Sequence, residues 1–460
     1  RVRLAPCDSP AAPRDALCGR YEVFEDRAAR RGRKISLKIV VLPPLTARPA
    51  PDPVFYFVGG PGAAATGSAA APLMTYLRRT REVVLVDQRG TGESNPLNCN
   101  LRGDADDMRV YFGEPFPVER VRACRSELEK IADLRLYTTP VAMADLEEVR
   151  GALGYGRINV AGGSYGSTAA LAYLRLYPSR VRTAAVFGVA PLNFKMALPF
   201  AKAVEGALAR LFTDCDADAR CRAAFPRLRE EFAELHARLG RTPATFEATN
   251  PVTRRRQQLT MTREALMELV RVMLYQPNLT ALLPLLVHEM HGGAYARFAE
   301  IAYNFVRRLD GARIARGMHL SVTCSESFPF ITDEEIRRES AGTFHGDYRV
   351  RQHARACESW PRGALPAGYL DAVKTEVPVL MLSGDLDPVT PPWGAAAVLS
   401  DYTRGRQIRI RNGTHTAYDC TDRLTAAFIE RGTADGLDAS CVGQIERPPF
   451  VTALPQQGAR

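Results

Sequence analysis

The stretch Arg157–Gly166 reads RINVAGGSYG and contains two patterns in succession. Residues Arg157–Ala161 are mostly apolar and β-branched, as in a buried strand. Three glycines then surround Ser164, and an alanine-rich stretch with helical character follows. Glycine removes side chains that would clash in a sharp turn and tolerates unusual backbone angles. The stretch therefore predicts a strand, a tight turn and a helix, with Ser164 at the turn.

The segment Gly162–Gly166 matches the pattern G-x-S-x-G, in which the serine of a strand–turn–helix unit is a nucleophile. The predicted strand and helix around it favour this interpretation over an ordinary glycine-rich turn, which is the alternative. A serine hydroxyl is protonated at neutral pH, so it needs a base whose tautomer a carboxylate fixes. The N–H of Tyr165 would donate to the oxyanion. Ser164 is the predicted nucleophile, and Tyr165 is a predicted oxyanion donor.

The acid and the base are expected after later strands, in the chain order Ser, Asp, His. Val377–Leu382 and Gln407–Ile410 have strand patterns; Asp387 follows the first and His415 follows the second. Asp385 is the rival acid, but the proline after Asp387 suits a turn that leaves its carboxylate outside the sheet. The other histidines all lie before these strands. We therefore expect Asp387 to be the acid and His415 the base.

A glycine-rich loop after an early strand is expected to supply the second oxyanion donor. Val54–Val58 predicts that strand, and Gly59–Gly62 (GGPG) follows it directly. Glycine lets the backbone approach a substrate closely, and proline stiffens the turn. The N–H of Gly60 is the predicted donor, and a simple glycine–proline turn is the alternative.

Strand and helix patterns alternate in the first part of the chain, which favours a parallel sheet with crossover helices. Further strands are predicted at Ile35–Val41, Val83–Val86 and Thr183–Val189. From about residue 192 to 365 the periodicity is helical, and it is clearest over Ala201–Phe212, Pro226–Leu239 and Thr262–Tyr275. The predicted class is α/β, an α/β-hydrolase fold whose mostly parallel sheet has flanking helices, plus a helical cap inserted after the sixth strand region. Residues 1–191 and 366–460 would form the catalytic domain, and residues 192–365 the cap.

Composition excludes several classes of protein. The 460 residues carry a net charge of +10, and 46% are hydrophobic and 24% charged, as in globular proteins. No apolar run approaches the roughly 20 residues that span a bilayer. The arginines are scattered among acidic residues, without a basic arm or a nucleic-acid recognition signature. We expect neither a membrane span nor nucleic-acid binding.

The ten cysteines form five neighbouring couples, and none lies in a CxxC pair typical of zinc or redox sites. Sequence alone does not fix their connectivity, and sequential pairing is the simplest prediction. The predicted disulfides are Cys7–Cys18, Cys99–Cys124, Cys215–Cys221, Cys324–Cys357 and Cys420–Cys441. Five disulfides would indicate a secreted or periplasmic protein; ten free thiols in a cytosolic enzyme are the alternative. The chain opens without methionine or an apolar signal segment, so we expect a mature form.

Two histidines of the predicted cap, His288 and His291, lie three residues apart on one helix. The pair lacks the HExxH spacing and a nearby third ligand, so we interpret it as a polar helix face. No metal and no organic cofactor is expected.

Four motifs occur together and in order: Val58–Gly62, Asp87–Ser94 (DQRGTGES), Gly162–Gly166 and Gly384–Pro391 (GDLDPVTP). With them the sequence resembles the proline iminopeptidase and tripeptidyl aminopeptidase family of α/β-hydrolase serine exopeptidases, most closely its secreted tripeptidyl-aminopeptidase-like branch. That branch has a C-terminal segment like Leu382–Phe450, with a disulfide of the Cys420–Cys441 type. The resemblance covers nearly the whole chain and is looser in the cap.

The resemblance implies the same catalytic residues, namely Ser164, Asp387 and His415, with Gly60 and Tyr165 at the oxyanion. Val58 differs from the histidine that often precedes GGPG in proline iminopeptidases.

The resemblance also implies that a carboxylate from the cap binds the free amine of the substrate. Glu326, beside a predicted disulfide, is the candidate, and a surface glutamate in a loop is the alternative. The predicted function is a serine hydrolase, an exopeptidase that releases one to three residues from peptide N-termini through an acyl-enzyme. A carboxylesterase or other acyl hydrolase on small esters or amides is the alternative. A catalytically silent binding protein is a third hypothesis, against which the complete triad order argues.

Overall fold

The structure is a computed structural model that describes residues 2–8, 12–311 and 314–454. Within these residues one sheet of nine strands has the order β1-β2-β3-β5-β4-β6-β7-β10-β11. Its strands are β1 (Ala5–Pro6), β2 (Leu17–Phe24), β3 (Lys34–Leu42), β4 (Val54–Phe57), β5 (Val83–Val86), β6 (Ile158–Gly163), β7 (Val181–Phe187), β10 (Val379–Gly384) and β11 (Gly405–Ile410). From β5 to β11 all neighbouring strands are parallel, whereas β1, β2 and β3 pair antiparallel. The predicted mostly parallel sheet is confirmed.

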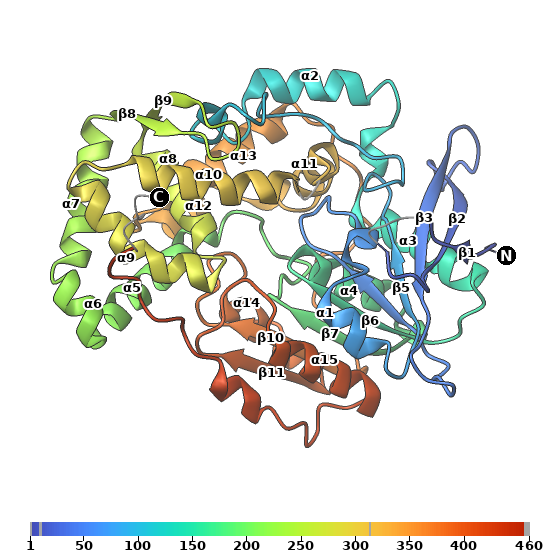
Figure 1. Cartoon of the computed structure of the whole chain (residues 1–460). Helices are drawn as coiled ribbons and strands as arrows, with labels where there is room; N and C mark the ends of the chain where they lie inside the picture. Colours follow the sequence, from blue (N-terminus) through green and yellow to red (C-terminus); the bar gives the residue numbers. More distant parts are fainter. Residues whose placement is uncertain (1, 9–11, 312–313, 455–460) are drawn as a thin grey trace.

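Helices cover both faces of the sheet (Figure 1). α2 (Val118–Leu128), α3 (Thr139–Ala152) and α4 (Tyr165–Leu176) share one apolar core with one face. α1 (Pro72–Leu77) and α15 (Asp419–Arg431) share a second core with the opposite face. Side chains alternate between these cores along β5, because successive side chains of a strand point to opposite faces. The predicted flanking helices are therefore confirmed.

The insertion follows β7, the seventh strand of the chain, and not the sixth as predicted. The strand count differs because the sequence pattern does not predict β1 and β2. The insertion contains α5 (Phe200–Ala217), α6 (Ala219–Ala224), α7 (Leu228–Arg241), α8 (Arg263–Met273), α9 (Pro277–His291), α10 (Ala296–Gly311), α11 (Arg316–Glu326), α12 (Asp333–Ser340) and α13 (Tyr348–Glu358). The three predicted helices of this region are confirmed as α5, α7 and α8. An antiparallel hairpin, β8 (Ala244–Thr249) and β9 (Arg256–Met261), was not predicted.

Two separate cores divide this region. Elements α5 to α10 pack around a separate core, which also includes the hairpin, Met108, Tyr111, Phe112 and Phe450. Helices α11 and α13 instead contribute buried residues to the core that α3 and α4 share with the sheet. The domain boundaries at residues 191 and 365 remain a prediction. Among the described residues, no helix combines the length and the apolar character needed to cross a bilayer.

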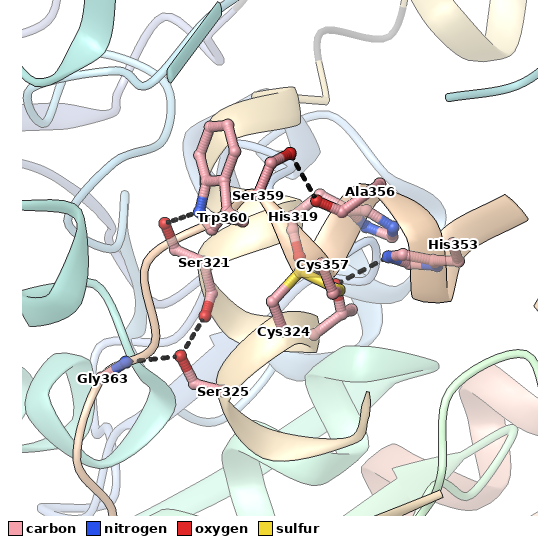
Figure 2. The surroundings of a disulfide bond; sticks show 11 residues. His319, Ser321, Cys324, Ser325, His353, Ala356, Cys357, Ser359, Trp360 and Gly363 are labelled. Atoms are coloured by element: carbon pink, nitrogen blue, oxygen red, sulfur yellow. Dashed lines mark hydrogen bonds between the residues drawn. A yellow bond between two sulfur atoms is a disulfide. The ribbon is translucent and has the colours of Figure 1, made fainter. Parts of the chain in front are cut away.

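All ten cysteines are disulfide-bonded in the five predicted pairs. The Cys324–Cys357 bond links α11 to α13, and Figure 2 shows its surroundings. Beside this bond, Trp360 Nε1 donates to Ser321 Oγ at 3.0 Å, and the N–H of Gly363 donates to Ser325 Oγ at 2.9 Å. These cross-links fix the relative position of α11 and α13, both of which reach the candidate active site.

Candidate active site

Ser164 occupies the junction between β6 and α4 with φ 56° and ψ −129°. This positive φ is rare for a residue with a side chain, and it is the conformation of a strained turn. A Cβ on Gly162 would lie 2.3 Å from the carbonyl oxygen of Gly166, and one on Gly166 would lie 2.2 Å from that of Phe57. Both glycines are therefore required by the turn, and the predicted strand–turn–helix unit is confirmed.

His415 and Asp387 form a hydrogen-bonded pair, with 2.7 Å between Nδ1 and Oδ2. Asp387 also accepts the N–H groups of Val389 and Thr390, each at 2.8 Å, and the Thr390 hydroxyl at 2.7 Å. Burial by itself would raise the pKa of Asp387, but His415 and these hydrogen bonds lower it below its ordinary value. An ionised Asp387 holds the proton on Nδ1, so that Nε2 of neutral His415 is left free to act as a base.

The rival acid, Asp385, lies apart from this pair. Its Oδ1 accepts a hydrogen bond from Nε of Arg409 at 2.8 Å, and the Arg409 side chain is largely exposed. Of the two aspartates after β10, the structure brings Asp387 to His415.

Ser164 and His415 line the same cavity, whose volume is about 390 Å³. Gly60 and Tyr165 line it as well. Gly59 packs directly on the serine, because a Cβ there would lie 3.1 Å from Ser164 Cβ. The structure thus places four of the five predicted residues at one cavity, and Asp387 lies behind them, hydrogen-bonded to His415. The individual roles of these five residues remain predictions.

The motif Asp87–Ser94 contacts the residue that follows Ser164 and holds neighbouring loops by hydrogen bonds. Asp87 accepts the N–H of Thr66 at 2.9 Å and that of Glu93 at 3.1 Å. Gln88 Oε1 accepts the hydroxyl of Tyr165 at 3.2 Å, which connects the motif to the residue after the serine. The motif therefore has a structural role that its sequence alone does not reveal.

Helices of the insertion form the opposite wall of the cavity and carry most of its charge. The charged lining residues are Arg102, Glu268, Arg271, Asp310, Arg316 and Arg349. Sequence reasoning missed these residues. A usable signal exists on α8, where Glu268 and Arg271 interrupt a run of buried apolar side chains. Charged residues at positions that helical periodicity assigns to a core are rarely buried unless they are paired with other charges, so they mark a charged site.

The position of Glu326 differs from the prediction, because this residue does not lie among those that line the cavity. It is the last residue of α11, and its Oε1 accepts the N–H of Thr139 at 2.6 Å within the catalytic core. The predicted amine-binding carboxylate is therefore not in contact with the cavity. Burial raises the pKa of Glu326 from 4.5 to about 7.

Glu326→Gln should change how stability depends on pH. Because the folded-state pKa is raised, the contribution of Glu326 to wild-type stability is fully present below about pH 4.5 and is lost as pH rises through about 7. Glutamine keeps an acceptor for Thr139 and does not titrate. The free energy of unfolding of the variant, relative to wild type, should rise by up to about 3 kcal/mol between pH 4 and pH 8, measured by urea denaturation. The exposed Glu358→Gln is the control, and parallel pH profiles of Glu326→Gln and wild type would contradict the prediction.

The histidine pair of α9 takes part in contacts with α7. His288 Nδ1 bonds Glu231 Oε2 at 2.9 Å, and His291 Nε2 bonds Glu234 Oε2 at 2.7 Å. Each histidine thus has its own glutamate, which accounts for the pair as a helix–helix contact.

The fold and the arrangement of Ser164, His415 and Asp387 define a serine hydrolase. The chain matches the α/β hydrolase fold family over residues 52–268 and the TAP-like protein family over residues 342–441. Serine protease Hip1 of Mycobacterium tuberculosis is 24% identical, over 96% of this chain and 91% of that protein. Proline iminopeptidase of Neisseria gonorrhoeae is 32% identical over 30% of this chain and 32% of that protein. Tripeptidyl aminopeptidase of Streptomyces coelicolor is 27% identical over 38% of this chain and 36% of that protein.

The chain belongs to the α/β-hydrolase family, in the group of serine peptidases that these relatives represent. The predicted family resemblance is confirmed.

Proposed function

We propose that this protein is a serine exopeptidase that releases one to three residues from peptide N-termini. The observation that carries the proposal is the charged cavity onto which Ser164 and His415 both open. Cap helices on its far wall restrict entry to chain ends and small molecules. A wholly apolar cavity would favour simple esters, whereas this cavity contains ion pairs suited to a charged chain end. Two relatives are named proline iminopeptidase and tripeptidyl aminopeptidase, and these names support the same substrate class.

In the proposed mechanism Ser164 attacks the carbonyl carbon of the substrate while His415 Nε2 accepts the hydroxyl proton. The N–H groups of Gly60 and Tyr165 stabilise the tetrahedral oxyanion. His415 then gives the proton to the leaving amine, and the acyl group remains on Ser164. Water, deprotonated by His415, releases the acyl group and regenerates the enzyme.

Glu268 and Asp310 replace Glu326 as the proposed acceptors for the substrate amine. They are the two carboxylates among the described residues that line the cavity. Glu268 Oε2 accepts from Arg271 at 2.9 Å, and Oε1 lies 3.1 Å from His345 Nε2. Each carboxylate oxygen has a second lone pair, so an ammonium can bind beside these partners, against the repulsion of the neighbouring arginines.

We also propose that the protein is exported to the periplasm or the medium. Its five disulfides support this location, because such bonds persist in oxidising compartments.

The function is tested with aminoacyl and tripeptidyl 4-nitroanilides, each with a free and an N-acetylated amine, beside short 4-nitrophenyl esters. Acetylation should lower kcat/KM by about 10- to 100-fold, because it removes charge-assisted hydrogen bonds to the ammonium. Equal turnover of free and acetylated amides would contradict the exopeptidase proposal. Turnover of the esters alone would favour the carboxylesterase alternative.

A further inference from the structure

Four arginines surround one end of the active-site cavity. Arg271 lies on α8, Arg316 on α11, Arg349 on α13, and Arg102 in the loop before α2. The Cys324–Cys357 disulfide holds two of these helices, α11 and α13, together (Figure 2). The arginines therefore converge from separate parts of the chain onto a rigid frame.

The carboxylates of the cavity do not balance these charges. Asp310 pairs with Arg316 and, at 2.7 Å, with Arg102. Glu268 pairs with Arg271 at 2.9 Å and lies 3.6 Å from Arg349. Among the described lining residues, four guanidinium groups therefore face two carboxylates.

Two of the guanidinium groups also have unused donors. The Nε atoms of Arg271 and Arg349 are buried and have no hydrogen-bond partner among the described residues. The Arg271 side chain is only 7% exposed, and that of Arg349 is 13% exposed. A buried donor without a partner costs free energy, and a buried charge costs more. Burial lowers the pKa of Arg349 to about 10, an effect that Arg271, Arg316 and Arg102 reinforce.

A short chain of contacts connects the arginines to the catalytic histidine. Arg271 Nη1 donates to the hydroxyl of Tyr275 at 3.2 Å. The Tyr275 ring stands edge-on to His415, with 5.0 Å between ring centroids. One tyrosine thus separates Arg271 from His415, and an extended peptide covers at most about 3.5 Å per residue. A group bound by the arginines lies within a few residues of the scissile bond.

We propose that Arg271 and Arg349, with Arg102 and Arg316 beside them, form a subsite for a carboxylate of the substrate. Guanidinium groups match the geometry of carboxylates and bind them with paired hydrogen bonds. The preferred substrates are then peptides with an acidic side chain, or with a free C-terminal carboxylate, close to the cleaved bond. This inference rests on the proposed function for the choice of peptides as substrates.

The test compares kcat/KM within matched pairs of peptides. One set places glutamate or glutamine at each position within three residues of the scissile bond, with an amidated C-terminus. The other set compares a peptide that has neutral side chains and a free C-terminal carboxylate with the same peptide carrying a C-terminal amide. In at least one pair the anionic member should be favoured by about 10- to 100-fold, the range that charge-assisted hydrogen bonds provide. The set that shows the larger ratio identifies the source of the carboxylate.

Arg349→Gln should bring that ratio close to one, and Arg349→Lys should retain part of it. Arg351→Gln is the matched control, because Arg351 lies on the same helix but pairs with Asp347 and Asp333. It should leave the ratio unchanged. Thermal unfolding of each variant verifies that it is folded.

Ratios near one for every pair, a preference for lysine peptides, or an unchanged ratio in folded Arg349→Gln would overturn the subsite. If no peptide is cleaved, the proposed function fails, and the subsite is judged separately with two esters. These are the 4-nitrophenyl monoesters of glutaric acid and of its neutral monoamide, after subtraction of the uncatalysed rates. The acid should be favoured in wild type and lose its advantage in Arg349→Gln; equal rates would overturn the subsite.

Discussion

Ser164→Ala is expected to lower kcat by about 10⁶-fold while the protein remains as stable as wild type. The substitution removes only the hydroxyl that attacks the substrate. Alanine meets the same backbone strain at φ 56° as serine does, so the turn is neither relieved nor further strained. The midpoint of thermal unfolding should therefore change by less than about 2 °C.

The measurements are turnover of the best substrate and covalent labelling by a fluorophosphonate. Wild type and the exposed Ser179→Ala control should be labelled and active, and Ser164→Ala should be neither. Labelling that persists in Ser164→Ala would remove the nucleophile from the proposal. A wild-type protein that is not labelled would instead support the hypothesis of a silent binding protein.

The elbow could be predicted from sequence because its cause is local. Gly162 and Gly166 are fixed by backbone contacts within one turn and with the adjacent strand, and a short pattern captures these contacts. Asp387 and His415 could be predicted because strand order alone places both at the carboxyl ends of neighbouring parallel strands. These inferences need no knowledge of side-chain packing.

Elements that depend on distant packing could not be predicted. The hairpin β8–β9 alternates exposed residues with partly or fully buried ones, and only its partners in the cap give it an apolar face. Strand β2 has a mostly solvated pattern because it lies near the edge of the sheet. The family resemblance implies an amine-binding carboxylate in the cap, for which Glu326 is the candidate, but α11 directs Glu326 to Thr139. The direction in which a helix faces is decided by its neighbours, which a spacing pattern does not specify.

The arginines of the cavity illustrate the same limit. Arg271, Arg316 and Arg349 lie far apart in the insertion, Arg102 lies well before it, and no motif joins the four. Because the chain is rich in arginine, the sequence does not distinguish these four from the others. Only the fold shows that they line one cavity. The residues proposed to be catalytic could thus be found from the sequence, whereas the residues proposed to select the substrate could not.

Asp387→Asn is expected to lower kcat by about 10⁴-fold with little change in fold. The amide oxygen of asparagine can still accept the N–H groups of Val389 and Thr390, so the turn after β10 stays satisfied. Its NH₂ group, placed toward His415 Nδ1, cannot accept the proton that the carboxylate accepts at 2.7 Å. The imidazole is then held in the tautomer whose Nε2 carries the proton, and it cannot deprotonate Ser164.

Asp385→Asn is the matched control, because it makes the same chemical change two residues away. It removes only a surface ion pair with Arg409, and such pairs contribute about 0–1 kcal/mol. Its kcat should stay within about twofold of wild type, since the Asp387–His415 bond is untouched. Circular dichroism and thermal unfolding verify that both variants are folded. Only the carboxylate that orients the imidazole is needed for each turnover. A large loss of kcat in Asp385→Asn, with Asp387→Asn near wild type, would therefore assign the role of the acid to Asp385.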